Sequence, residues 1–172
     1  MQRHQRFLKF GKIASPARTD HGPHQFGRGA GQRRRGTASP SCPALAIDQS
    51  VSRFVPTFAY EFNDENAPEN FLPPVSFPYG AAHASEIQYL MDLPTAAFPG
   101  TLSAQQQQLA AIMKGYWTNF AKRGFPSSVG TPFWPLFSNL TQKMQSLAPA
   151  TPDTETDVAT THNCAFWTAL EG

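Results

Sequence analysis

The stretch GAAHASEIQYL, residues 80–90, places a histidine between a glycine–alanine turn and a short apolar helix. A lone histidine in that position more often caps or packs against a helix than performs catalysis. A metal site built on His83 and Glu86 needs further ligands, which only His162 and scattered carboxylates could supply. From these residues alone, the structural, catalytic and metal-binding interpretations of His83 stay open.

A longer helix with clear ends is predicted after this stretch. Ser103 is a suitable N-cap, and Gln106 three residues later completes the pattern of a capping box. Gly124 and then Pro126 end the helix. Its apolar residues form one continuous stripe: Leu109, Ile112, Met113, Tyr116, Trp117 and Phe120. This pattern indicates core packing rather than function.

The remaining elements are predicted from shorter patterns. Residues 55–62 favour a strand, and residues 142–148 a weaker one. Residues 134–137, Trp-Pro-Leu-Phe, are typical of a packed anchor segment. Residues 151–161 are polar and predict a loop, whereas the apolar residues after Cys164 predict a short terminal helix.

The first 40 residues differ in composition from the rest of the chain. They contain nine basic side chains and one acidic one, whereas the remainder carries a net charge of −6. With few apolar residues, residues 1–40 are predicted to be disordered or unrelated to the globular part, residues 41–172. Arg33, Arg34 and Arg35 could contact phosphates, but no zinc spacing, aromatic platform or recognition helix accompanies them, so nucleic acid is not the expected partner.

The hydropathy of the chain predicts no membrane span, because no run of about 18 apolar residues occurs. We also see no apolar stretch of the kind that follows the charged start of a secretory signal.

Five separate strings in the globular part occur in a specific order. They are PTFAYEF (residues 56–62), GAAHASEIQYL (80–90), YWTNFAKRG (116–124), WPLF (134–137) and CAFW (164–167). Together, in this order and at these spacings, they resemble the C-terminal portion of the type-B carboxylesterases, the cholinesterase-like family. The resemblance begins near Ser41 and covers about the last quarter of a family member.

The resemblance implies an α/β fold, namely the C-terminal part of an α/β-hydrolase. It also implies hydrolysis of small-molecule carboxylic esters through a Ser–His–Glu/Asp triad, without a metal or another cofactor. His83 matches the catalytic histidine of the motif Gly-x-x-His-x-x-Glu, and Glu86 matches its acid, which we expect to shape the histidine turn. The triad acid of the family lies upstream.

Cys42 and Cys164 match a pair that forms a long-range disulfide in the family. Such a bond implies that the parent enzyme is exported to an oxidising compartment, although the chain shows no export signal. The residues alone do not show that the two cysteines pair, and two isolated thiols are the simpler interpretation.

The chain contains no Gly-x-Ser-x-Gly nucleophile elbow. In this fold, the oxyanion hole comes from the residue after the nucleophile and from an early loop. We therefore expect a fragment of an ester hydrolase that supplies the catalytic histidine and is inactive alone. A noncatalytic cholinesterase-like interaction module is the alternative, and the intact histidine motif disfavours it.

Overall fold

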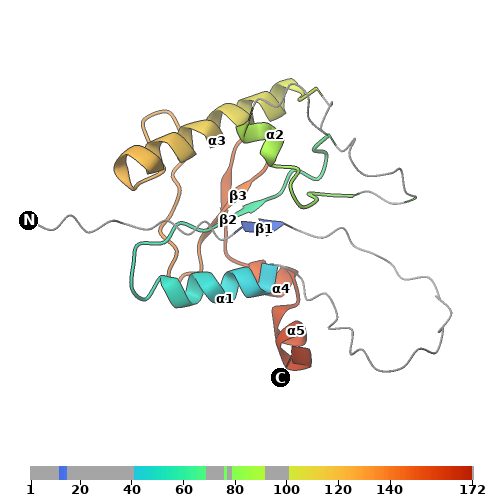
Figure 1. Cartoon of the computed structure of the whole chain (residues 1–172), viewed down its shortest axis with the longest axis vertical. Helices are drawn as coiled ribbons and strands as arrows, with labels where there is room; N and C mark the ends of the chain where they lie inside the picture. Colours follow the sequence, from blue (N-terminus) through green and yellow to red (C-terminus); the bar gives the residue numbers. More distant parts are fainter. Residues whose placement is uncertain (1–11, 15–40, 69–75, 77–78, 92–100, 172) are drawn as a thin grey trace, which may run out of the picture.

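The computed structural model describes residues 12–14, 41–68, 76, 79–91 and 101–171 (Figure 1). Its elements in chain order are β1 (Lys12–Ala14), α1 (Ser41–Val51), β2 (Tyr60–Phe62), α2 (Ile87–Leu90), α3 (Ala104–Arg123), β3 (Met144–Leu147), β4 (Asp153–Glu155), α4 (Val158–Thr161) and α5 (Cys164–Glu171). The prediction that residues 1–40 are disordered concerns residues outside the described ranges, apart from β1. The sequence did not predict β1.

The four strands form one sheet in the order β1-β2-β3-β4. β1, β2 and β3 run parallel, and β4 pairs antiparallel with β3. Tyr60 lies opposite Gln145, and Phe62 lies opposite Leu147. Figure 1 shows α2 and α3 on one face of the sheet and α1 and α4 on the other. Helices on both faces suit a largely parallel sheet, whose strands bury both sets of side chains.

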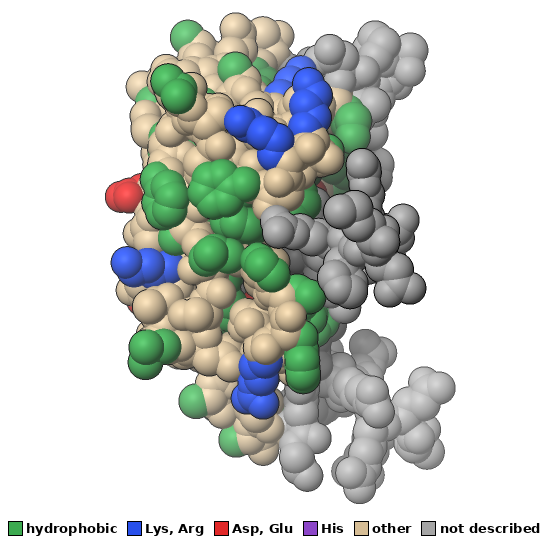
Figure 2. Space-filling view, turned by 90° about the vertical axis from the view of Figure 1, so that its left-hand side faces the viewer, with side chains coloured by type: hydrophobic (Ala, Val, Ile, Leu, Met, Phe, Trp, Pro, Cys, Tyr) green, Lys and Arg blue, Asp and Glu red, His purple; other side chains and the backbone are tan. Residues whose placement is uncertain are grey.

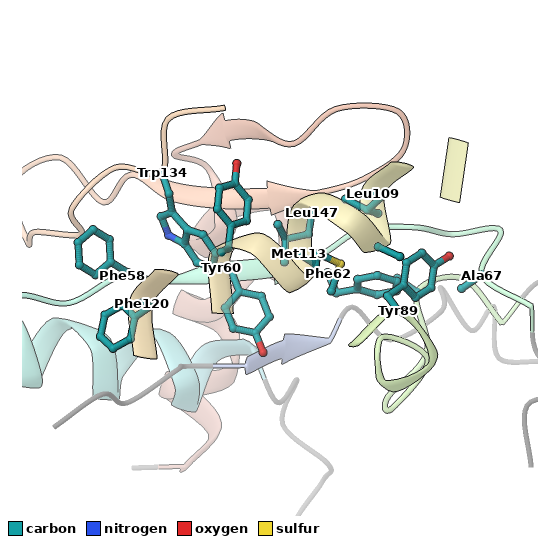
Figure 3. Close-up of a cluster of buried hydrophobic side chains, with 13 residues drawn as sticks. Phe58, Tyr60, Phe62, Ala67, Tyr89, Leu109, Met113, Phe120, Trp134 and Leu147 are labelled. Atoms are coloured by element: carbon teal, nitrogen blue, oxygen red, sulfur yellow. The ribbon is translucent and has the colours of Figure 1, made fainter. Parts of the chain in front are cut away.

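The larger hydrophobic core lies between the sheet and α3 (Figure 3). α3 has the predicted capping box, and Gly124 ends it in the left-handed conformation, with φ at 70°. The predicted stripe faces this core: Leu109, Met113, Tyr116 and Phe120 are buried, and Ile112 and Trp117 pack against them. Side chains of β2 and β3 that point to this face, among them Phe62 and Leu147, complete the core.

A smaller core on the opposite face joins the sheet to α1 and α4. It contains Leu45, Ala59, Phe137, Met144 and Val158. The predicted anchor segment connects the two cores. Within it, Trp134 Nε1 donates a hydrogen bond to the carbonyl of Ala59 at 3.0 Å, and Phe137 bridges to Thr57. Leu136 is exposed, whereas Trp134, Pro135 and Phe137 are buried.

Two sequence predictions need correction, and one helix was missed. The polar loop expected at residues 151–161 contains β4 and α4. β4 is an edge strand and needs no apolar alternation, because it completes its hydrogen bonds with β3 alone. The strand expected at residues 55–62 is regular only over Tyr60–Phe62. α1 was not predicted, because Pro43 in its first turn and its mixed composition obscure a helical pattern.

One face of the molecule carries exposed apolar side chains (Figure 2). The exposed apolar residues include Phe54, Phe125, Val129, Phe133 and Leu140. The rings of Phe125 and Phe133 lie 6.3 Å apart, so part of this apolar surface is continuous. Contiguous exposed apolar side chains are typical of a surface that contacts another polypeptide.

Candidate functional site

His83 lies in a tight turn immediately before α2. Two unusual backbone conformations shape this turn, because Gly80 and Ala84 have φ angles of 64° and 75°. A positive φ is uncommon for alanine, so the surrounding contacts must hold the turn in place. Ser85 contributes to them by donating hydrogen bonds to the carbonyl of Ala82 from both its amide, at 3.1 Å, and its hydroxyl, at 2.7 Å.

The turn points the two motif residues in opposite directions. The His83 side chain is exposed, whereas Ser85 and Glu86 are buried. Within the described residues, no side chain forms a hydrogen bond or ion pair with the imidazole of His83. The imidazole is therefore available to a group outside the described residues.

Glu86 lies close enough to β2 to influence the strand electrostatically. Burial of the Tyr60 hydroxyl raises its pKa above the ordinary value, and the nearby charges of Glu86 and Asp48 raise it further. The buried carboxylate of Glu86 thus adds to the effect of burial in favouring the neutral form of the Tyr60 phenol.

The histidine turn lies toward the carboxyl ends of the parallel strands. Tyr89 of α2 packs against Phe62, the last residue of β2, with ring centroids 5.0 Å apart. In open α/β sheets, ligands bind outside the carboxyl ends of the strands. His83 therefore occupies the part of such a fold where reactive groups are expected.

A second polar cluster lies on the opposite face of the sheet. His162 Nε2 and Glu61 Oε1 are 2.6 Å apart, and both side chains are buried. Asn63 Nδ2 donates to Ser146 Oγ at 2.7 Å and to Glu155 Oε2 at 3.2 Å. No local sequence pattern indicates this cluster, because its members come from β2 and the residue after it, β3, β4 and the end of α4.

His162 is thus bonded to Glu61, and among the described residues no metal site assembles around His83 and Glu86. In the part of the chain that the structure describes, no group of three His, Cys, Asp or Glu side chains could hold a metal ion. Among the same residues, no helix is long and apolar enough to cross a membrane.

Cys42 and Cys164 are joined by a disulfide, with their Cα atoms 5.3 Å apart. The bond links the start of α1 to the start of α5 across 122 positions of sequence. The carbonyl of His162 lies 3.8 Å from Cys42 Sγ, so the disulfide and the buried polar cluster are neighbours.

The family of the chain follows from comparison with known proteins. A sequence model of the carboxylesterase family matches residues 31–167, which is most of the chain. The chain belongs to the carboxylesterase family. The match begins ten residues before the boundary predicted at residue 41.

Related carboxylesterases are much longer than this chain. Pyrethroid hydrolase Ces2e of Rattus norvegicus is 30% identical over 60% of the chain but only 18% of its own length. Cocaine esterase of Homo sapiens is 32% identical over 63% of the chain and 19% of its own length. The chain therefore spans about a fifth of these relatives.

Solved esterase structures share the fold. A PNB esterase superposes with a TM-score of 0.54 at 22% identity, covering 70% of the chain and 24% of the esterase. A thermophilic PNB esterase gives the same TM-score at 21% identity. The prediction of a carboxylesterase C-terminal portion with part of an α/β-hydrolase fold is confirmed.

Proposed function

We propose that this chain supplies the catalytic histidine, His83, of a serine-dependent carboxylic-ester hydrolase. The observation that carries the proposal is an exposed imidazole within the motif Gly-x-x-His-x-x-Glu, at the carboxyl side of the sheet, in a chain of the carboxylesterase family. In this role, His83 takes the proton from the serine hydroxyl as the ester is attacked and returns it to the leaving alcohol. Imidazole suits both steps, because it changes charge near neutral pH.

Glu86 serves as a support for the turn rather than as the triad acid. Its carboxylate is buried and points inward, whereas the imidazole of His83 points outward. A triad acid orients the imidazole through a hydrogen bond. No described carboxylate makes such a bond to His83, so we assign the triad acid to an upstream part of the family fold.

The 172 residues alone are proposed to hydrolyse esters at the background rate. They contain no Gly-x-Ser-x-Gly elbow, and an imidazole without an activated serine and an oxyanion hole retains little catalytic power. The exposed apolar side chains in Figure 2 support the idea that the rest of an esterase fold packs against this part. The disulfide supports an oxidising compartment for the complete enzyme.

A chimera tests the proposed role. Residues 31–172 replace the matching C-terminal part of a complete carboxylesterase, such as the cocaine esterase of Homo sapiens, and hydrolysis of a short chromogenic ester is measured. We expect turnover by the chimera and its loss, by at least about 10³-fold, in His83→Ala. The isolated 172-residue chain and its His83→Ala variant should both match the uncatalysed rate. Equal turnover by the chimera and its His83→Ala variant would contradict the proposed catalytic role of His83.

A further inference from the structure

The carboxylate of Asp64, just after β2, is the centre of a buried hydrogen-bond network. The side chain is only 2% exposed, and within the described ranges no basic side chain pairs with it. Its hydrogen bonds instead come from neutral donors. Oδ1 accepts from the amide of Asn66 at 3.0 Å, and Oδ2 accepts from Gln106 Nε2 at 2.8 Å and from the hydroxyl of Tyr89. A buried carboxylate is costly unless such bonds compensate it, so this network specifies one arrangement of its donors.

The donors come from three separate segments that meet beside the histidine turn. Asn66 lies on the loop after β2, Tyr89 on α2 and Gln106 in the first turn of α3. Gln106 is itself held in place, because its Oε1 accepts from the amide of Ser103 and its Nε2 also donates to the carbonyl of Asn66. Asp64 thereby fixes α2 relative to both the sheet and α3.

Short local bonds transmit the position of α2 to His83. The amide of Tyr89 donates to the carbonyl of Glu86 at 3.0 Å, and the amide of Ile87 donates to the carbonyl of Ala84, the residue after His83. The exposed imidazole of His83 makes no hydrogen bond to another described side chain. Its position therefore depends on the backbone of the turn and of α2. A shift of Tyr89 therefore moves the imidazole with it.

We propose that Asp64 is a positioning residue for His83, acting through the hydroxyl of Tyr89; this inference rests on the proposed function. A general base must lie within hydrogen-bond distance of the hydroxyl that it deprotonates, and a displacement of about 1 Å costs about 100-fold in rate. Asp64 thereby keeps the imidazole of His83 aligned with a serine that belongs to the upstream part of the fold. The role concerns rate rather than ester binding, because Asp64 is buried away from solvent.

The first test follows the imidazole signals of His83 by NMR in the full 172-residue chain. Asp64→Asn retains the shape of the side chain but replaces one acceptor with a donor, and Tyr89→Phe removes the hydroxyl. We expect both variants to shift the His83 signals while leaving those of His162, on the opposite face of the sheet, unchanged. Leu45→Ala, in the smaller core, is the matched control for general destabilisation and should leave the His83 signals in place. Unchanged His83 signals in Asp64→Asn, or equal shifts in Leu45→Ala, overturn the inference.

The second test uses the esterase chimera and covers variants that fold poorly alone. Asp64→Asn and Tyr89→Phe should each lower kcat by about 10- to 100-fold, with KM changed less than about twofold. The double variant should lose little more than either single variant, because both act through one contact. If His83→Ala abolishes turnover while Asp64→Asn retains the original kcat, the positioning role of Asp64 is contradicted and the proposed function of His83 is retained. If His83→Ala is fully active, the proposed function fails as well.

Discussion

His162 Nε2 lies 2.6 Å from Glu61 Oε1, and the two side chains are 7% and 3% exposed. His83, by contrast, is exposed and has no partner among the described side chains. The two histidines therefore lie in different environments. His162 bonds Glu61 of β2, lies beside the disulfide and contributes to the fold, whereas the imidazole of His83 is exposed.

Removing His162 should destabilise the chain. His162→Ala leaves the buried carboxylate of Glu61 without its imidazole partner, and breaking a buried pair in this way costs about 3 kcal/mol. Urea unfolding followed by tryptophan fluorescence measures this loss. His162→Gln keeps a hydrogen-bond donor and should recover part of the stability. Equal unfolding midpoints for His162→Ala and the unchanged chain would show that the pair contributes nothing.

Glu155 should make stability depend on pH. Burial, then the charge of Glu61 and a hydrogen bond to it, raise the pKa of Glu155 from 4.5 to about 8. Between these values the folded chain keeps a proton that the unfolded chain has released. The contribution of Glu155 is thus complete below pH 4.5 and decreases as the pH rises through 8.

Glu155→Gln, which cannot ionise, should remove this decline and raise Tm at pH 8 by a few degrees, while changing Tm little at pH 4.5. Thermal unfolding at several pH values between these limits measures the effect. Asp153→Asn, an exposed acid on the same strand, is the control. A decline that persists unchanged in Glu155→Gln would contradict the assignment.

The disulfide should be a major source of stability. Closing a loop across 122 positions restricts the unfolded chain, and the chain-entropy model assigns about 4–5 kcal/mol to a loop of this size. We expect Cys42→Ser with Cys164→Ala to lower the free energy of unfolding by about that amount. The unchanged chain should also migrate faster on a gel without reductant than with it. Identical migration under both conditions would show that the bond is not formed.

The N-cap of α3 should contribute a smaller amount. Ser103 Oγ accepts from the amide of Gln106 at 3.3 Å, and losing a serine cap costs about 1 kcal/mol. Chemical denaturation of Ser103→Ala measures this cost. Ser103→Asp, which retains an acceptor, should unfold at the midpoint of the unchanged chain. A similar loss in both variants would indicate that the side chain acts through packing instead.

Local sequence patterns predicted the parts of the fold that local forces determine. α3 is specified by its cap, its apolar stripe and its terminal glycine, and the structure places all three as expected. The strand at residues 144–147 was also predicted, because its apolar residues lie within a short segment. β4 was missed, since its residues are polar and carry no strand pattern, and only its pairing with β3 defines it.

The polar clusters could not be predicted in the same way. Glu61 and His162 are 101 positions apart, and nothing in either neighbourhood indicates that both are buried. Asp64 occurs within a turn-forming run, where an exposed aspartate is the ordinary expectation. The histidine motif was recognisable because its residues are adjacent in the sequence. The residues that surround it come from distant segments, so they could be identified only from the structure.

The rate at which a fluorophosphonate ester labels the nucleophilic serine of the chimera tests the role of His83 most directly. This reaction reports activation of the serine without depending on release of an alcohol. We predict that His83→Ala slows labelling by at least about 10³-fold, whereas His162→Gln labels at nearly the rate of the unchanged chimera. Labelling of His83→Ala at the unchanged rate, in a chimera with unaltered Tm, would contradict the assignment of His83 as the base.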